Sequence, residues 1–356
     1  MTLHATAPVL DEVELADLIG RHRAFWHRDP VDGPLVSYSK ARYGGDKPVP
    51  GEAVSITPET ILSRSEATVS SLGSGYERRG TTHGDLFNSS PFPTPPWMEA
   101  VLGCPIKVFV NTSTDWREPL PGGWDAVRQI QPGMGGPWRD ALLDVVTRAS
   151  RELGHKYPLG NPLIRAPIDC LAAMVGDEAL CYLLFDEPDE IKRVADICAD
   201  IWLELTASWL DVAVPFAGGH FNQMGLWAPG TTNIFTVDAS TLLSPAQYRE
   251  IFLDRDARLA GGVEYPLIHV HAEACHQVEG WLGLPNLAIQ IDDGHILVEG
   301  GWTFHKSWPE LLAVYRKVQE AGHPLLLHLT AEHFAEARVT LDPRGLAYSV
   351  TERIPD

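Results

Sequence analysis

The stretch "TTNIFTVDASTLLSPAQYREIFLDRDARLAGGVEYPLIHVH" (residues 231–271) gives the clearest indication of the fold. It begins with an apolar run at 231–238 and ends with a second one at 265–271, and each run predicts a strand. Between them, a proline follows Ser244 and a glutamine stands three residues after that serine, which is typical of a capping box. A helix is therefore predicted over 244–261. Strand, helix and strand of this length indicate two parallel strands joined by a crossover helix.

The same alternation extends along the rest of the chain. Downstream, Ser307 with Glu310 forms a second capping-box pattern in front of an apolar-periodic segment. The remaining downstream elements are predicted as a short helix around 276–282, strands at 287–292 and 323–330, and helices at 308–322 and 331–338. Upstream, strands are predicted at 34–39 and 105–110, and helices at 57–73, 136–154 and 188–210.

Repeated units of this kind predict an α/β TIM (β/α)8 barrel. A doubly wound open sheet is the alternative, but no GxGxxG or GxxxxGK[ST] loop follows a predicted strand, which argues against nucleotide binding. The length of 356 residues suits one large barrel domain. We assign residues 31–356 to the barrel and residues 1–30, with helical periodicity in "LDEVELADLIGRHRAFWHRD", to an N-terminal helical extension.

Composition and charge exclude several classes of protein. Hydrophobic residues make up 44% of the chain and charged residues 21%, as in globular proteins. The net charge of −19 would repel nucleic acid and anionic membrane surfaces. No signal peptide and no apolar stretch of membrane-spanning length is found, so we expect a cytoplasmic protein. The five cysteines form an odd set without a CxxC pair, which argues against a disulfide framework or a zinc ribbon.

Polar side chains end several of the predicted strands. Active sites of TIM barrels lie at the carboxyl-terminal ends of the strands, so these residues are the candidates for chemistry. They are Asp238, His269, His271, Asp292, Asp293 and His328.

Two of these candidates form a chelating pair. His269 and His271 are two residues apart, so on an extended strand both side chains point to the same face. His328, at the end of another strand, is the predicted third ligand of a catalytic metal site. Glu273 and the nearby Cys275 and His276 are the alternative ligands. Three imidazoles suit zinc, and iron, nickel or copper are the other candidates.

The polar residues at strand ends can have either a structural or a functional role. A strand-end histidine is commonly structural, and Asp238 or Asp292 can cap the helix that follows its strand. As functional residues, Asp238, Glu273 and Asp292 would serve in acid/base catalysis or hold the metal ligands. Residues predicted to contact the substrate are Tyr38, Lys40, Arg42, His83, Asp85 and His220.

Five segments carry a resemblance to a known family. They are "RHRAFWHRDPVDGPLVSY" (21–38), "GDLFNSSPFPTPPWMEAVLGCPI" (84–106), "LLFDEPDEIKRVADICADIW" (183–202), "VDASTLLSPAQYREIFLDRDARL" (237–259) and "PLIHVHAEACHQVEGWLGLPNLAIQID" (266–292). In order and in character they resemble the uroporphyrinogen decarboxylase superfamily, over most of the chain. The resemblance implies a TIM barrel, in agreement with the alternation of strands and helices.

The resemblance implies two kinds of chemistry. The superfamily includes metal-free decarboxylases, whose "MRQAGRY" motif is absent here, and zinc-dependent methyltransferases that act between methylcorrinoids and thiols. The methyltransferases bind zinc through His-x-Cys on the strand that here carries His269 and His271, and through a cysteine near the position of His328. Imidazoles in place of thiolates leave the ion more electrophilic.

The leading hypothesis is a metal-dependent enzyme most like these methyltransferases, acting on a small substrate with zinc and with a corrinoid as methyl donor or acceptor. The alternatives are a cofactor-free decarboxylase-like lyase acting on a carboxylated, tetrapyrrole-like substrate, and a non-catalytic corrinoid- or tetrapyrrole-binding protein. The chain has no DxHxxG segment for a corrinoid, so the corrinoid would be free or carried by a separate protein. The expected partners are this separate corrinoid protein and a second copy of the chain, with which it would form a homodimer.

Overall fold

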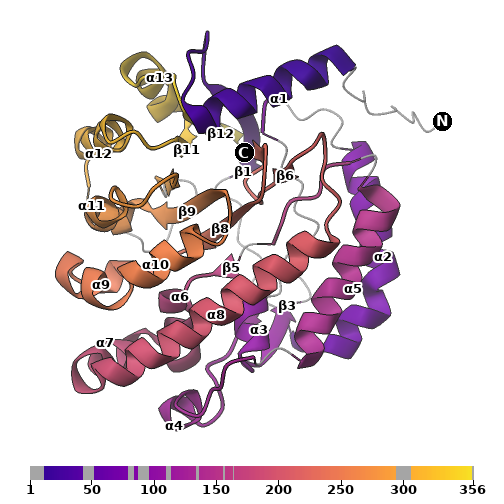
Figure 1. Ribbon diagram of the computed structural model, residues 1–356, viewed down its shortest axis with the longest axis vertical. Coiled ribbons are helices and arrows are strands. Elements are labelled where there is room, and N and C mark those ends of the chain that lie inside the picture. Colours follow the sequence, from indigo (N-terminus) through magenta and orange to yellow (C-terminus); the bar gives the residue numbers. More distant parts are fainter. Residues whose placement is uncertain are drawn as a thin grey trace.

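The protein is an α/β structure built around one parallel sheet (Figure 1). The computed structural model describes residues 12–42, 52–78, 84–86, 96–109, 114–133, 136–154, 157–162, 164–293 and 306–354. The strands of the sheet are β1 (Leu35–Arg42), β5 (Ile164–Arg165), β8 (Thr232–Thr236), β9 (Tyr265–His271), β10 (Ala288–Asp292), β11 (Leu325–Thr330) and β12 (Leu346–Ile354).

The strand order is that of a barrel. The seven strands follow one another as β1-β12-β11-β10-β9-β8-β5, and every neighbouring pair is parallel. The last strand thus returns beside the first, which happens when a sheet of βα units curls round on itself. Within the described residues, no strand pairs with both β1 and β5. The predicted TIM-barrel α/β fold is confirmed in its parallel sheet and in its strand order.

Helices cover the outside of the sheet and follow one another around it in chain order (Figure 1). Two 3-10 helices, η1 (Asp238–Leu242) and η2 (Ala272–Gln277), begin at the ends of β8 and β9. The α-helices are α1 (Glu12–His27), α2 (Pro58–Arg78), α3 (Trp97–Val101), α4 (Gly123–Val127), α5 (Gly136–Leu153), α6 (Pro167–Val175), α7 (Asp177–Asp186), α8 (Pro188–Val212), α9 (Pro245–Ile251), α10 (Leu253–Ala260), α11 (Val278–Trp281), α12 (Trp308–Glu320) and α13 (Ala331–Thr340).

The local sequence signals account for the helix starts. Both predicted capping boxes are present, with Ser244 and Gln247 in front of α9 and with Ser307 and Glu310 in front of α12. The helix predicted over 244–261 is divided at its middle into α9 and α10. Among the helices that the structure describes, none combines the length and the apolarity that a membrane crossing would require.

Two small antiparallel sheets lie outside the barrel. The strand predicted at 105–110 forms, but it pairs with neighbours on both sides in a sheet of its own. That sheet consists of β2 (Ala53–Ile56), β3 (Ile106–Phe109) and β4 (Thr114–Arg117), and the other consists of β6 (His220–Phe221) and β7 (Trp227–Ala228).

The helix α1 closes the amino-terminal end of the barrel. Its Trp26 indole donates a hydrogen bond to the carbonyl oxygen of Trp227 at 2.8 Å. Its Arg21 forms an ion pair of 2.6 Å with Asp85. The carboxylate of Asp85 also accepts a hydrogen bond from the backbone amide of Val36, at the start of β1. The helix predicted within residues 1–30 is thus present, while the domain boundary at residue 30 stays a prediction.

The inside of the barrel changes from apolar to polar along the strands. Near the amino-terminal ends, the inward side chains form a buried apolar cluster with Phe25 and Trp26. Two residues further along each strand, the register places Thr236, His269 and Gln290 side by side. Because successive side chains alternate between faces, these polar residues share the inner face with the apolar layer. The inner apolar layer consists of Leu35, Ile234, Leu267, Ala288, Leu326 and Ala347.

Candidate metal centre

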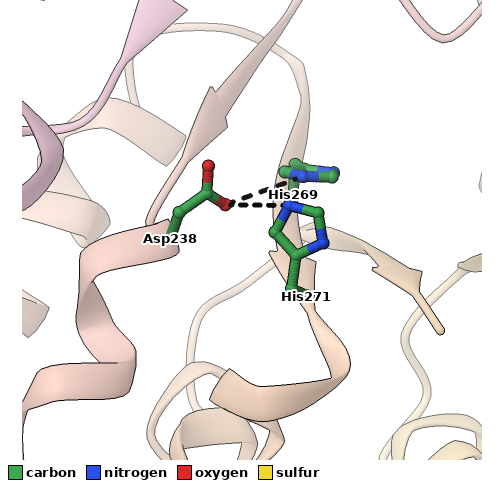
Figure 2. Close-up of side chains that lie close together, drawn as sticks. All are labelled: Asp238, His269 and His271. Atoms are coloured by element: carbon green, nitrogen blue, oxygen red, sulfur yellow. Dashed lines mark ion pairs between the residues drawn. The ribbon is translucent and has the colours of Figure 1, made fainter. Parts of the chain in front are cut away.

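Two imidazoles and one carboxylate meet at the carboxyl-terminal end of the barrel. Asp238 Oδ1 lies 3.6 Å from Nε2 of His269 and 3.8 Å from Nε2 of His271. Figure 2 shows the carboxylate, from the start of η1, directed at both rings on β9. One ligand atom from each of the three residues can be chosen so that all lie within 4.8 Å of one another. In the part of the chain that the structure describes, no other group of three potential ligands is this compact.

The parallel register brings these residues together. His269 pairs with Thr236, the last residue of β8, and Asp238 follows two residues later. Neighbouring parallel strands end at the same edge of a sheet, so the start of η1 lies beside the end of β9. The alternation of side chains then directs both histidines to the inner face. The two histidines predicted as a pair from their spacing therefore lie beside the carboxylate of Asp238, which follows the neighbouring strand.

His269 is oriented by a residue on the next strand. Its Nδ1 contacts the side-chain oxygen of Gln290, so Nδ1 carries the proton and Nε2 presents its lone pair toward Asp238. Burial lowers the pKa of His269, although the nearby charge of Asp238 acts in the opposite direction. A neutral imidazole with its second nitrogen held by a hydrogen bond is the form in which histidine binds metals.

Asp238 Oδ1 is buried and has no hydrogen-bond partner among the described residues, although the side chain as a whole is 43% exposed. A buried carboxylate oxygen without a donor is costly, and its presence in a structure calls for an explanation. Ligand atoms around a tetrahedral zinc ion lie about 3.4 Å from one another, given bonds of about 2.0–2.2 Å. The distances of 3.6 and 3.8 Å to the two imidazoles are close to that value. The donor set and its spacing fit a divalent cation.

A second carboxylate holds the turn that carries Asp238. Asp169, on α6, accepts hydrogen bonds from the hydroxyl of Thr236 at 2.6 Å and from the amide of Ala239 at 2.8 Å. Burial, assisted by the charge of Asp238, raises the pKa of Asp169 to about 8. Asp169 thus anchors the residues on both sides of Asp238.

An arginine faces the same group from β5. Arg165, which pairs in register with Thr236, forms an ion pair with the fully buried Glu99. Burial lowers the pKa of Arg165, but Glu99 and two further carboxylates outweigh that effect and raise it. Asp238 is one of those carboxylates. The arginine therefore balances part of the negative charge beside the candidate metal centre.

The predicted third ligand, His328, is not a member of this group. Its Nδ1 lies 3.1 Å from a carboxylate oxygen of Asp292, and its Nε2 lies 3.0 Å from the hydroxyl of Thr351. β11 is separated from β9 by β10, and the side chain of His328 is engaged on its own side of the barrel. Asp238, predicted as an acid/base residue, has the position relative to His269 and His271 that was expected for His328.

The residues that follow His271 lie on η2 and outside the three-residue group. Glu273 is half-buried. Cys275 is buried, and burial raises its pKa to about 12, which disfavours the thiolate that would bind a metal. The ring of His276 contacts the carbonyl oxygens of Glu273 and Leu243, each at 3.0 Å, and so holds η2 against the segment after η1.

The predicted substrate contacts are placed away from this centre where the structure describes them. Asp85 and His220 lie at the amino-terminal end of the barrel, His220 with a contact of 3.2 Å to the carbonyl oxygen of Gly230. The ring of Tyr38 faces Phe334 of α13 at 6.0 Å. His83 lies outside the described residues, and Lys40 and Arg42 belong to the end of β1 with side chains outside the described part.

A cavity of about 650 Å³ lies at the opposite end of the barrel from the candidate centre. It is formed where the end of α1 meets the segments that precede β9, β10 and β11, and none of the site residues predicted from the sequence lines it. Its lining includes Trp26, Arg28, Tyr265, Asn286 and His323. Active sites of TIM barrels lie at the carboxyl-terminal ends of the strands, so the metal group and not this cavity is the candidate site.

Sequence reasoning missed four residues of the site. Gln290 stands two residues before Asp292 in "AIQID" and shares its face, so the alternation that selected Asp292 could have selected it as well. Arg165 ends a strand of only two residues, and Asp169 lies in the first turn of a helix, where a carboxylate is ordinarily a favourable charge. Thr351 has no distinctive signal in the sequence.

Comparisons with known proteins support the fold. A scan against protein-family profiles and a search of curated protein sequences find no match to this chain. Among solved structures, it is similar to a methyltransferase from Methanosarcina mazei, with a TM-score of 0.51, 11% sequence identity and coverage of 95% of this chain and 94% of the other. A B12-independent methionine synthase from Shewanella sp. W3-18-1 matches with a TM-score of 0.39 at 10% identity, over 69% of this chain and 63% of that one. The similarity to the Methanosarcina mazei structure, at 11% identity, shows a shared α/β fold and no more than the fold.

Proposed function

We propose that this chain is a metal-dependent enzyme of the methyltransferase type, most like the zinc- and corrinoid-linked members of the uroporphyrinogen decarboxylase superfamily, and that it acts on a small substrate. The observation that carries the proposal is the buried Oδ1 of Asp238, which lacks a hydrogen-bond donor among the described residues and faces two imidazole nitrogens. The similarity to the fold of a Methanosarcina mazei methyltransferase supports the reaction class.

Asp238, His269 and His271 would hold the ion. Two imidazoles and a carboxylate form a ligand set of catalytic zinc sites, in which a fourth position stays open for water or substrate. When bound, the ion supplies a Lewis acid that polarises a coordinated group and lowers its pKa. Gln290 keeps the ring of His269 in the metal-binding orientation, and Asp169 keeps the first turn of η1 in place. Glu273 is proposed to serve in acid/base catalysis or to hold a metal ligand. A separate corrinoid protein and a second copy of the chain, in a homodimer, are the proposed partners.

Metal content tests the proposal first. The purified protein, loaded with zinc and desalted, is expected to hold about one metal ion per chain by elemental analysis, as a three-ligand site would. His271→Ala should lose the ion. His220→Ala is the matched control, because His220 lies at the other end of the barrel, and it should retain the metal. Wild-type protein without metal under these conditions would refute the proposed site.

Turnover tests the reaction class. Zinc-loaded protein is mixed with methylcobalamin and a set of small acceptors, and loss of the methyl group is followed through the visible spectrum of the corrinoid. The expected result is demethylation that stops after removal of the metal with a chelator. Full turnover by the chelated protein would contradict the proposed metal dependence.

A further inference from the structure

Arg165 lies on the inner face of the barrel, in the same layer as His269. Arg165 pairs in register with Thr236, and Thr236 pairs with His269. Side chains at paired positions of neighbouring parallel strands point to the same face, so Arg165 shares the interior of the barrel with the imidazole of His269. Burial lowers the pKa of Arg165, but the charges of Glu99 and two further carboxylates, of which Asp238 is one, raise it above the usual value. The cation therefore stands beside the candidate metal centre.

Part of this arginine stays accessible. Glu99 of α3 is fully buried and accepts a hydrogen bond from Nη1 of Arg165, while the side chain of Arg165 retains 27% exposure. A guanidinium carries five N–H donors in a fixed fork, so a contact of Nη1 with one carboxylate leaves donors for a second acceptor. A small molecule that enters the carboxyl-terminal end of the barrel can reach the exposed part.

Loading of the metal centre would change the charge that Arg165 faces. In the metal-free protein, the carboxylates of Glu99 and Asp238 act together on the single positive charge of the arginine. Asp169 adds little negative charge at neutral pH, because burial, assisted by the charge of Asp238, raises its pKa to about 8. A divalent ion bound by Asp238 would more than cancel the charge of that carboxylate. The ion, the arginine and the two carboxylates would then be positive overall, which fits a ligand with a single negative charge.

The shape of the donor group selects among such anions. The planar fork of a guanidinium matches the two oxygens of a carboxylate through parallel N–H···O bonds. β5 and β9 lie on either side of β8, two strand spacings or roughly 10 Å apart. A short carbon chain spans such a distance. The carboxylate of a substrate at Arg165 and its reacting group at the metal centre would therefore be at opposite ends of the molecule.

We infer that Arg165 is the specificity-determining residue of the proposed enzyme and that it binds the carboxylate of a small organic acid. The inference rests on the proposed function and names its substrate class, a short-chain monocarboxylate whose reacting group is remote from the carboxylate. Glu99 is the positioning residue, since it holds the guanidinium from the buried side. The neutral amide of the same acid lacks the charge that Arg165 recognises.

Binding of a simple carboxylate tests the inference without turnover. Acetate is titrated into zinc-loaded protein, and binding is followed through the broadening of its methyl resonance in the NMR spectrum. Acetamide has almost the same shape but no charge and is the matched probe. The wild type should bind acetate about tenfold more tightly than acetamide, because hydrogen bonds between two charged groups are the stronger ones.

Two single variants should change the acetate affinity in opposite directions. Arg165→Gln removes the cation and should weaken acetate binding by about tenfold. Glu99→Gln removes a competing carboxylate and should tighten acetate binding by roughly threefold or more. The double variant Glu99→Gln/Arg165→Gln leaves no unpaired buried charge, so it replaces Arg165→Gln if that variant fails to fold, and it should bind acetate as weakly. Arg258→Gln is the matched control, because Arg258 pairs with Asp200 on the outer surface, and it should bind acetate as the wild type does.

Three outcomes would overturn the inference. They are equal affinities of the wild type for acetate and acetamide, an unchanged acetate affinity after loss of Arg165, and weaker acetate binding by Glu99→Gln. If the ion pair served the fold alone, both single variants would change acetate binding in the same direction. All variants should still hold zinc, since neither residue belongs to the metal group. Failure of the wild type to bind zinc would instead refute the proposed function, so the two failures are distinguishable.

Discussion

Replacing Asp256 with asparagine is expected to stabilise the protein at neutral and alkaline pH. Asp256 lies on α10, which packs against the strand that carries both histidines, and it is 1% exposed. Its Oδ2 accepts hydrogen bonds from the hydroxyl of Tyr248 at 2.5 Å and from the indole of Trp281 at 3.0 Å. An amide oxygen can accept both bonds, so the asparagine keeps these two contacts and removes the group that titrates, while its NH2 brings two donors that do not change with pH.

The magnitude follows from the pKa of this carboxyl group. Burial raises the pKa of Asp256 from 3.8 to about 7, against the two hydrogen bonds, which lower it. Between these values the folded protein retains a proton that the unfolded chain has lost, so the free energy of unfolding falls by about 1.4 kcal/mol per pH unit. The contribution is fully present below the unfolded pKa and is lost as the pH rises through the folded pKa. The whole loss amounts to about 4 kcal/mol.

Urea unfolding at a series of pH values measures this effect. The free energy of unfolding of Asp256→Asn minus that of the wild type should grow by about 3 kcal/mol between about pH 5 and about pH 8. Asp254→Asn is the matched control, because Asp254 is exposed on the same helix, and it should follow the wild type. Parallel curves for Asp256→Asn and the wild type would refute the reasoning, since they would mean that burial does not shift the proton equilibrium of this group.

Three further predictions concern the site and the scaffold. Gln290→Leu should weaken zinc binding by about 10–100-fold in competition with a chromophoric chelator, because the ring of His269 loses its orienting partner; unchanged affinity would contradict that role. Leu267→Ala, in the inner apolar layer, should lower the free energy of unfolding by about 2–5 kcal/mol in urea, and a loss below about 1 kcal/mol would show that the layer is not closely packed. Ser307→Ala should cost about 1 kcal/mol in the same assay and Glu310→Gln less, since glutamine can also complete a capping box.

The predicted elements show where local signals are sufficient. The capping boxes at Ser244 and Ser307 each begin a helix as expected, and the apolar runs at 231–238 and 265–271 correspond to β8 and β9. The strand predicted at 105–110 is also present, but it belongs to an antiparallel sheet outside the barrel. A run of apolar residues specifies an extended conformation without specifying its partner, because pairing depends on contacts distant in the sequence.

The candidate site shows a similar division. The spacing of His269 and His271 was enough to predict that both rings face the same side, and Figure 2 shows them doing so. The spacing could not predict which residue lies beside the two histidines as the third member of the candidate metal centre. Asp238 and His328 both lie near the carboxyl-terminal end of a strand. Only the order of the strands distinguishes the residue beside β9 from the residue two strands away.

The sequence by itself determined the periodicity of the elements, the positions of the helix caps, and the set of polar residues at strand ends, because these depend on neighbours within a few residues along the chain. The tertiary structure decided which of those residues meet. Register across the parallel sheet joined Asp238 to the two histidines, gave His269 its partner Gln290, and directed His328 to Asp292 and Thr351. A side chain at the end of a strand can contact either of the two neighbouring strands. The order of the strands and the curvature of the barrel determine which contact forms.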